Sequence, residues 1–265
     1  MSKRNRLIKA IKHPEWLLAV VFRRLSPFIK NDKFYLRILY FLEMKGKILH
    51  LENPRTFTEK LQWLKIYDYK PEYTQLVDKL AVKDYVASRI GKEYVIPTLA
   101  VWNSVEEIDW DSLPSQFVLK TTHGGGGCGV VVCTDKSKLD KETAIKKLRV
   151  SMHTNAGQIY REKPYLNVPR KIIAEKFIAE RKTHYENSFE ELKDYKFFCF
   201  GGKVKCFKID FGRFVEHHAN YYSPDGEFLP FGEKAYEPDS NHVENMPDNQ
   251  IVFSFLSARA DSEKV

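Results

Sequence analysis

The sequence is poor in cysteine, in glycine and proline, and in long apolar runs. Only four cysteines occur among 265 residues, and none forms a C-x-x-C pair, which excludes a disulfide scaffold or zinc ribbon and favours a reduced cytoplasmic protein. The 13 glycines and 12 prolines are too few for a collagen-like or linker-like chain. The apolar run Trp16–Phe22 is much shorter than the ~20 residues that span a bilayer. Because Arg23-Arg24 follows it and no small-residue cleavage site is present, we also expect no cleaved signal peptide.

Negative charge is scarce at the N-terminal end of the chain. Residues 1–65 contain 15 Lys+Arg and 5 Asp+Glu, whereas the remaining residues contain 28 and 30. An enzyme that acts on nucleic acid usually carries positive charge across its binding face, so we expect no nucleic-acid partner. Between Lys3 and Arg37, basic residues alternate with large apolar ones. This pattern fits either peripheral contact with the anionic inner face of the cell membrane or a helix packed on the protein itself.

Apolar periodicity and capping residues predict an α+β chain. Helices are expected from Thr56, which has Glu59 at capping-box spacing, from Asp78 to a stop at Gly91, and from Asp140. Strands are expected at 94–97, 99–102, 117–120, 130–134, 171–178, 195–200 and 204–209, the last two joined by the hairpin signal Gly201-Gly202. Hairpins join the strands as often as helices do, so we expect mainly antiparallel sheets.

The run from Lys120 to Gly129 is the sharpest local motif. Five glycines in six positions follow His123 and lie between two strand-like segments. Glycines leave room for a ligand and let successive backbone N–H groups turn towards an anion, and Lys120 would place a cation beside bound phosphates. The alternative is a loose hairpin tip. A Walker loop and a Rossmann fingerprint are both excluded because the glycines precede a strand-like segment and not a helix.

Five ordered blocks resemble the TupA-like branch of the ATP-grasp superfamily. They are Phe57–Lys65, Asp78–Val86, Leu113–Gly129, Ile172–Ile178 and Asp194–Lys203. The resemblance implies two α+β lobes with an ATP pocket between them and the glycine loop closing over the triphosphate. It also implies ATP-dependent carboxylate–amine ligation in bacterial cell-surface polysaccharide biosynthesis, with ATP and Mg²⁺ as cofactors and a carboxylate-bearing glycan or amino acid as substrate. The expected segments are 1–53 (basic helical), 54–112 (N-terminal helical or α+β), 113–180 (central lobe) and 181–265 (C-terminal lobe).

The same resemblance implies a role for each of fourteen residues. Nucleotide contacts are expected from the side chains or backbone of Lys79, Lys120, His123, Gly124, Gly125, Gly126, Gly127, Glu175, Lys176, Phe177, Ile178 and Asp194. Within this set, Glu175 and the backbone after it would meet the adenine edge, and Asp194 would contact the ribose or the substrate. Lys196 would face the γ-phosphate and Arg213 a phosphate or substrate carboxylate. The structural alternatives are a surface lysine at Lys79, a cross-strand ion pair for Asp194 and Lys196, and a solvated arginine at Arg213.

The chain departs from the family pattern at its C-terminal end. ATP-grasp enzymes hold Mg²⁺ with an Asp strand followed by a Glu-containing strand, and residues 249–265 show nothing similar. The metal ligands are therefore unknown, and we expect either a truncated or frame-shifted member or ligands that have moved. Two other functions stay open. One is a glycosyltransferase, suggested by Asp109-Trp110-Asp111, and the other is a non-catalytic nucleotide-binding or scaffold protein.

Overall fold

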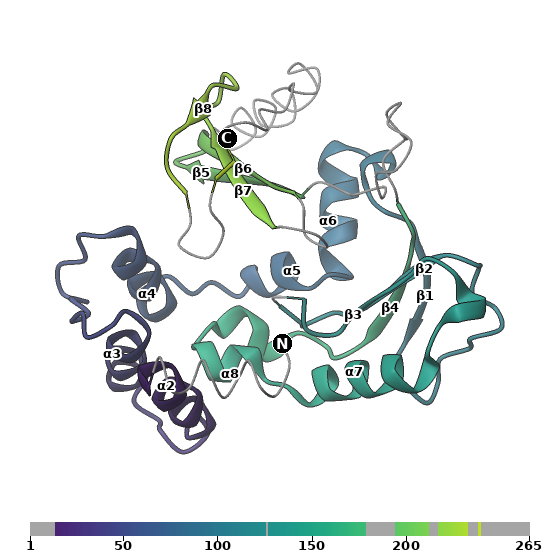
Figure 1. The fold of residues 1–265 in the computed structure, drawn as a ribbon, viewed down its shortest axis with the longest axis horizontal. Coiled ribbons are helices and arrows are strands. Elements are labelled where there is room, and N and C mark those ends of the chain that lie inside the picture. Colours follow the sequence, from purple (N-terminus) through teal and green to yellow (C-terminus); the bar gives the residue numbers. More distant parts are fainter. Residues whose placement is uncertain (1–13, 126, 179–193, 212–216, 233–237, 240–265) are drawn as a thin grey trace. The chain divides into compact units, whose positions relative to one another are not determined.

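The computed structural model describes residues 14–125, 127–178, 194–211, 217–232 and 238–239 (Figure 1). The chain divides into two compact units, Met1–Phe177 and Ile178–Val265. Each unit contains one antiparallel four-stranded sheet. Seven helices and two such sheets in the described ranges confirm the α+β class expected from the sequence.

Three helices form the start of the first unit: α2 (Pro14–Arg24), α3 (Asp32–Glu43) and α4 (Phe57–Tyr67). The capping box predicted for α4 is present, because Thr56 accepts a hydrogen bond from the Glu59 N–H and Glu59 accepts one from the Thr56 N–H. Helices α2 and α3 share a small core around Tyr35, where Phe22 stacks on the Tyr35 ring with centroids 5.1 Å apart. This core gives the basic N-terminal region its own packed structure.

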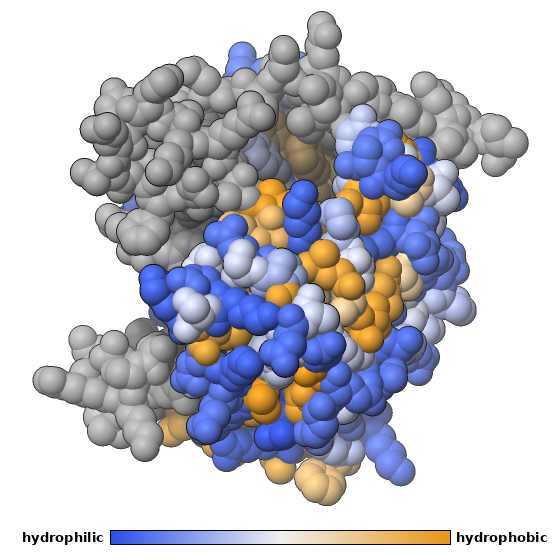
Figure 2. Space-filling model, turned by 90° about the vertical axis from the view of Figure 1, so that its right-hand side faces the viewer, coloured by the Kyte–Doolittle hydropathy of each residue, from blue (hydrophilic) through white to orange (hydrophobic). Residues whose placement is uncertain are grey.

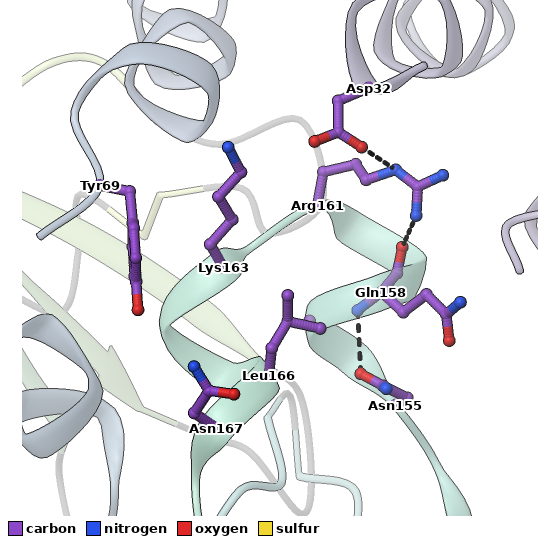
Figure 3. Close-up of a pocket in the computed structure, with 9 residues that line it drawn as sticks. Asp32, Tyr69, Asn155, Gln158, Arg161, Lys163, Leu166 and Asn167 are labelled. Carbon is purple, nitrogen blue, oxygen red and sulfur yellow. Dashed lines mark hydrogen bonds and ion pairs between the residues drawn. The ribbon is translucent and has the colours of Figure 1, made fainter. Parts of the chain in front are cut away.

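Arg161 ties this helical region to the next part of the unit (Figure 3). Its guanidinium donates to the carbonyls of Ser26 and Ile29, pairs with Asp32 at 2.9 Å and lies over the Tyr35 ring at 4.1 Å. The backbone of Arg161 is left-handed (φ +57°) and ends α8 (Ala156–Tyr160). Arg161 therefore joins the α2–α3 turn to α8 and forms part of the wall of a hollow of about 410 Å³.

Two helices precede the first sheet: α5 (Tyr73–Val77) and α6 (Ala81–Ile90). Asp78 accepts hydrogen bonds from the N–H groups of Leu80 and Ala81, and α6 stops at Gly91 (φ +112°), as the sequence predicts. The strand expected at 94–97 is wrong. Residues Lys92–Tyr94 form a 3₁₀ turn closed by a bond from the Val95 N–H to the Lys92 carbonyl, and Pro97 has no N–H for a ladder.

The first sheet has the strand order β1-β4-β2-β3. Its strands are β1 (Thr98–Trp102), β2 (Phe117–Thr121), β3 (Val130–Cys133) and β4 (Ile172–Lys176). Phe117 and Leu119 of β2 face a core closed by α7 (Lys141–His153). Because strand side chains alternate, Val118 and Lys120 face the opposite side. Val118 is the register partner of Glu175 on β4, so Lys120 and Glu175 share this second face of the sheet.

Strand β1 forms one edge of this sheet and alternates half-buried with exposed side chains. Leu99 and Val101 are the exposed apolar residues of that edge. Figure 2 shows the face of the molecule that lies on the right of Figure 1, where apolar residues form several separate areas between hydrophilic ones. Such scattered exposed residues are normal for a protein surface.

The second sheet has the order β5-β6-β7-β8. Its strands are β5 (Asp194–Phe200), β6 (Lys203–Phe211), β7 (His218–Tyr222) and β8 (Phe228–Leu229). Gly201 and Gly202 join β5 to β6 with φ values of +55° and +72°, which confirms the predicted two-residue hairpin. The rings of Phe207 and Tyr222 stack in its core with centroids 5.4 Å apart.

Candidate functional site

A buried carboxylate between two lysines marks the second face of the first sheet. Glu175 on β4 lies 2.6 Å from the Nζ atom of Lys120 on β2 and 2.6 Å from the Nζ atom of Lys83 on α6. The Glu175 side chain is only 5% exposed, while those of Lys83 and Lys120 are 13% and 27% exposed. Three elements thus meet through one carboxylate, and we call these residues the Glu175 cluster.

Lys83 is the member of this cluster that the sequence does not reveal. Besides Glu175, it donates to the Ile96 carbonyl and to Thr98 Oγ1, each at 2.8 Å. It lies on the first turn of α6, within the block Asp78–Val86 that resembles the family, but the resemblance gave it no role. A lysine on an amphipathic helix is ordinarily expected to be exposed to solvent.

Electrostatics keep the Glu175 carboxylate ionised despite its burial. Burial raises the pKa of Glu175, but hydrogen bonds from Lys120 and Lys83 outweigh this effect and leave the pKa below its usual value. Burial lowers the pKa of Lys79, and repulsion from Lys120 lowers it further. The site therefore contains more positive charge than Glu175 neutralises, which favours an anionic ligand.

The glycine loop has a packed base and an open tip. Thr121 Oγ1 and Ser151 Oγ lie 2.7 Å apart beneath it. A Cβ on Gly129 would lie 2.3 Å from Ser151 Oγ, and one on Gly124 would lie 2.4 Å from Thr121 Oγ1. At Gly125 and Gly127 a Cβ would meet nothing within 4 Å, and Gly126 is outside the described residues. The glycines at the base are thus required by close packing, and those at the tip leave room for a ligand.

Lys79 and His123 hold this loop to the rest of the unit. The Lys79 N–H donates to the Thr122 carbonyl at 3.2 Å, and its ammonium donates to the Gly124 carbonyl. His123 is buried, and its Nε2 lies 3.0 Å from the Ser151 carbonyl, so this nitrogen carries the proton. Burial lowers the pKa of His123. The contacts of His123 are those of an anchor for the loop, and its predicted contact with nucleotide stays a prediction.

A hollow of about 550 Å³ borders the glycine loop. The loop supplies Gly124, Gly125 and Cys128 to its lining, and the segment around α8 supplies Tyr160 and Tyr165. A cavity of this size with a few polar groups is typical of small-molecule sites.

The segment expected to meet adenine continues from β4. Lys176 is exposed, and its N–H donates to the Pro97 carbonyl at 3.0 Å. This backbone donor of the predicted hinge therefore already has a partner. Phe177 is half-buried, whereas Ile178 is 39% exposed. Ile178 belongs to the second unit in the division of the chain, and the predicted contacts of Phe177 and Ile178 with an adenine ring stay predictions.

In the second unit a buried carboxylate also contacts several basic side chains. Asp210 is 2% exposed, contacts the Lys196 ammonium and lies 3.4 Å from Lys208 Nζ and 3.0 Å from His217 Nε2. Lys196 also pairs with Asp194 at 2.6 Å. Burial raises the pKa of Asp210, but hydrogen bonds from Lys196 and His217 outweigh it and the pKa is lowered. The structural alternative of a cross-strand ion pair is present for Lys196, whose cross-strand partner is Asp210 on β6. The pair between Lys196 and Asp194 lies within β5.

Comparison with known proteins decides the family. The model of the family described as TupA-like ATPgrasp matches residues 59–254, a range that contains the Glu175 cluster, the glycine loop and the described strands of both sheets. The chain belongs to this family. A search of curated proteins found no match. Helices α2 and α3 precede the part of the chain that matches the TupA-like family.

ATP-grasp proteins generally bind ATP and Mg²⁺, and the described residues fit the two ligands unequally. The Glu175 cluster and the open glycine tip suit a nucleotide, because they combine positive charge with space beside Gly125 and Gly127. Within the described ranges, no group of three or more His, Cys, Asp or Glu side chains could hold a metal ion. Arg213, expected to contact phosphate or a substrate carboxylate, lies outside those ranges.

Proposed function

We propose that this TupA-like ATP-grasp chain binds ATP at the Glu175 cluster. The observation that supports it most directly is a buried carboxylate held between two lysines beside a glycine loop with an open tip. Lys120 would turn from Glu175 towards the phosphates, and the N–H groups from Gly125 to Gly127 would line the triphosphate. Glu175 accepts hydrogen bonds only, so it suits the exocyclic amino group of adenine and disfavours the O6 carbonyl of guanine.

We further propose that the bound ATP drives carboxylate–amine ligation. A carboxylate oxygen of the substrate would attack the γ-phosphorus, and ADP would leave. An amine would then attack the acyl phosphate carbon, and loss of inorganic phosphate would give the amide. Positive charge near the transferred phosphoryl group stabilises the charge that develops on it, and the excess of lysines over carboxylates near the loop supports such a role. The substrate class is a carboxylate-bearing glycan or amino acid of bacterial cell-surface polysaccharide biosynthesis, at the inner face of the cell membrane.

Calorimetry with ATP tests the binding site. Lys120→Met removes the charge but keeps most of the side-chain length, and it should weaken ATP affinity about ten- to a hundredfold, because a charge-assisted phosphate contact contributes ~1.5–3 kcal/mol. Lys136→Met is the matched control, since Lys136 is a half-buried lysine that donates to the carbonyls of Asp111 and Leu113. It should leave affinity unchanged. Equal affinity of wild type and Lys120→Met would refute the assignment, as would wild-type binding of GTP as tight as that of ATP.

The reaction is tested by the products. Release of ADP and phosphate that depends on both a carboxylate and an amine supports ligation, whereas release of a nucleotide from a nucleotide-sugar supports a glycosyltransferase. Asp109 of the acidic motif has a structural role in a turn, because its carboxylate accepts hydrogen bonds from the N–H groups of Asp111 and Ser112. ATP binding without any turnover would support the non-catalytic alternative.

A further inference from the structure

Helix α2 presents a row of apolar side chains to solvent. Leu17, Leu18, Val21, Leu25 and Phe28 are 45%, 57%, 50%, 46% and 80% exposed. Their spacing of three or four residues places them on one side of α2 and of the turn that continues it. We call these five residues the α2 stripe.

The opposite side of α2 already has its partner. Ala19 is 2% exposed, and Phe22 stacks on Tyr35 of α3. Packing on the protein itself thus explains the inner side of this helix and leaves the α2 stripe without an explanation. Burying large apolar side chains is favourable by ~25 cal/mol per Å², so five exposed ones on one side indicate a surface that is covered in use.

Positive charge borders the α2 stripe. Arg24 and Lys30 are exposed, and within the described ranges no acidic side chain pairs with either of them. In contrast, Arg23 and Arg37 are paired with Glu43 and Glu52. The cations that remain available therefore lie next to the apolar row. A second copy of this chain would bring like charges together at a two-fold interface, whereas anionic lipid offers both an apolar layer and negative headgroups.

We propose that the α2 stripe binds the surface of a membrane that contains anionic lipid. The stripe would enter the boundary between headgroups and acyl chains, and Arg24 and Lys30 would contact the headgroups. No helix among the described residues is long and apolar enough to cross a membrane, so the contact would be peripheral. This inference goes beyond the proposed function and does not depend on ATP binding.

Co-sedimentation of the full chain with vesicles tests this contact. We expect binding to phosphatidylcholine vesicles that contain phosphatidylglycerol, weak binding to phosphatidylcholine alone, and loss of binding as salt screens the charges over ~8–10 Å. Leu18→Ser with Phe28→Ser should reduce the partition coefficient at least about tenfold, because two exposed apolar contacts are lost. Val150→Ser, at a residue of α7 that is 59% exposed, is the matched control and should bind as wild type.

A second pair of variants separates local charge from net charge. Arg24→Gln with Lys30→Gln and Lys146→Gln with Lys147→Gln remove the same total charge, but the latter pair lies exposed on α7. Only the former should weaken vesicle binding, by about tenfold or more. Equal losses in both pairs would overturn the proposal, as would unchanged binding of the Leu18/Phe28 variant. Sedimentation velocity that shows a dimer dissociated by the Leu18/Phe28 substitutions, without vesicle binding, would also overturn it.

Discussion

Replacing Glu175 by glutamine should destabilise the first unit strongly at neutral pH. The substitution keeps the shape of the side chain but removes the charge that Lys83 and Lys120 share at 2.6 Å each. Removing one partner of a buried ion pair costs ~3–5 kcal/mol. Because the Lys120 side chain is 27% exposed and can regain water, we expect the lower end, about 3 kcal/mol. That is a large fraction of the ~5–15 kcal/mol by which domains are stable.

The effect should depend on pH with a defined sign. The pKa of Glu175 is lowered in the folded protein, so its contribution is fully present above its unfolded pKa and is lost as the pH falls through its folded pKa. The stability difference between wild type and Glu175→Gln should therefore be largest near neutral pH. It should shrink in acid, below the ordinary glutamate pKa of about 4.3.

Tryptophan fluorescence during urea unfolding can follow this unit separately. All four tryptophans lie between residues 1 and 177, and Trp102 and Trp110 pack against the core of the first sheet. Glu106→Gln is the control, because Glu106 and Arg149 form an ion pair of 2.8 Å that is exposed to solvent. This substitution should change the free energy of unfolding little. A loss below about 1 kcal/mol at neutral pH would contradict the reasoning, as would a loss that does not shrink when the pH falls well below about 4.3.

Four further substitutions test three other parts of the structure. Gly129→Ala should lower the melting temperature, because its φ is +69° and a Cβ would lie 2.3 Å from Ser151 Oγ. Gly125→Ala should leave the melting temperature unchanged and weaken ATP binding. Equal melting temperatures of the two variants would contradict the packed base of the loop. Arg161→Met should cost ~3 kcal/mol in urea unfolding, since several charge-assisted bonds are lost at once, and a loss within error would refute the role of this arginine. Asp210→Asn should speed amide hydrogen exchange in β6, because two lysines and His217 lose their shared carboxylate. Unchanged exchange would show that these contacts add nothing.

Local signals in the sequence were sufficient for elements whose ends are set by neighbouring residues. The Thr56–Glu59 box and the glycines at 91 and 201–202 act over four residues or fewer, and the structure contains each of them. The prediction of a strand at 94–97 was wrong because it rested on apolar composition. In the structure the Val95 N–H donates to the Lys92 carbonyl and closes a turn. The α+β class followed from the order of elements and was confirmed.

The candidate site was only partly predictable, because its contacts join residues far apart in the chain. Lys120 was found from its position before the glycine loop and Glu175 by resemblance to the family, but their direct pairing follows from the register of β2 and β4. Lys83 joins the cluster only because α6 packs beside β1 and β4. Arg161 has no motif, since two of its acceptors are the carbonyls of Ser26 and Ile29. These lie far earlier in the chain, and every residue possesses such a carbonyl.

The bonds of Arg161 have a consequence for the proposed membrane contact of α2. They fasten the α2–α3 turn to α8, and the segment around α8 shares a hollow with the glycine loop. If α2 binds a membrane surface, the glycine loop is therefore held at a fixed distance from that surface and in a fixed orientation. A lipid-linked substrate would search for it in two dimensions and at a high effective concentration, as in any tethered encounter. A substitution at Arg161 would remove these bonds and the fixed orientation of the loop, and it would change no residue of the proposed nucleotide site.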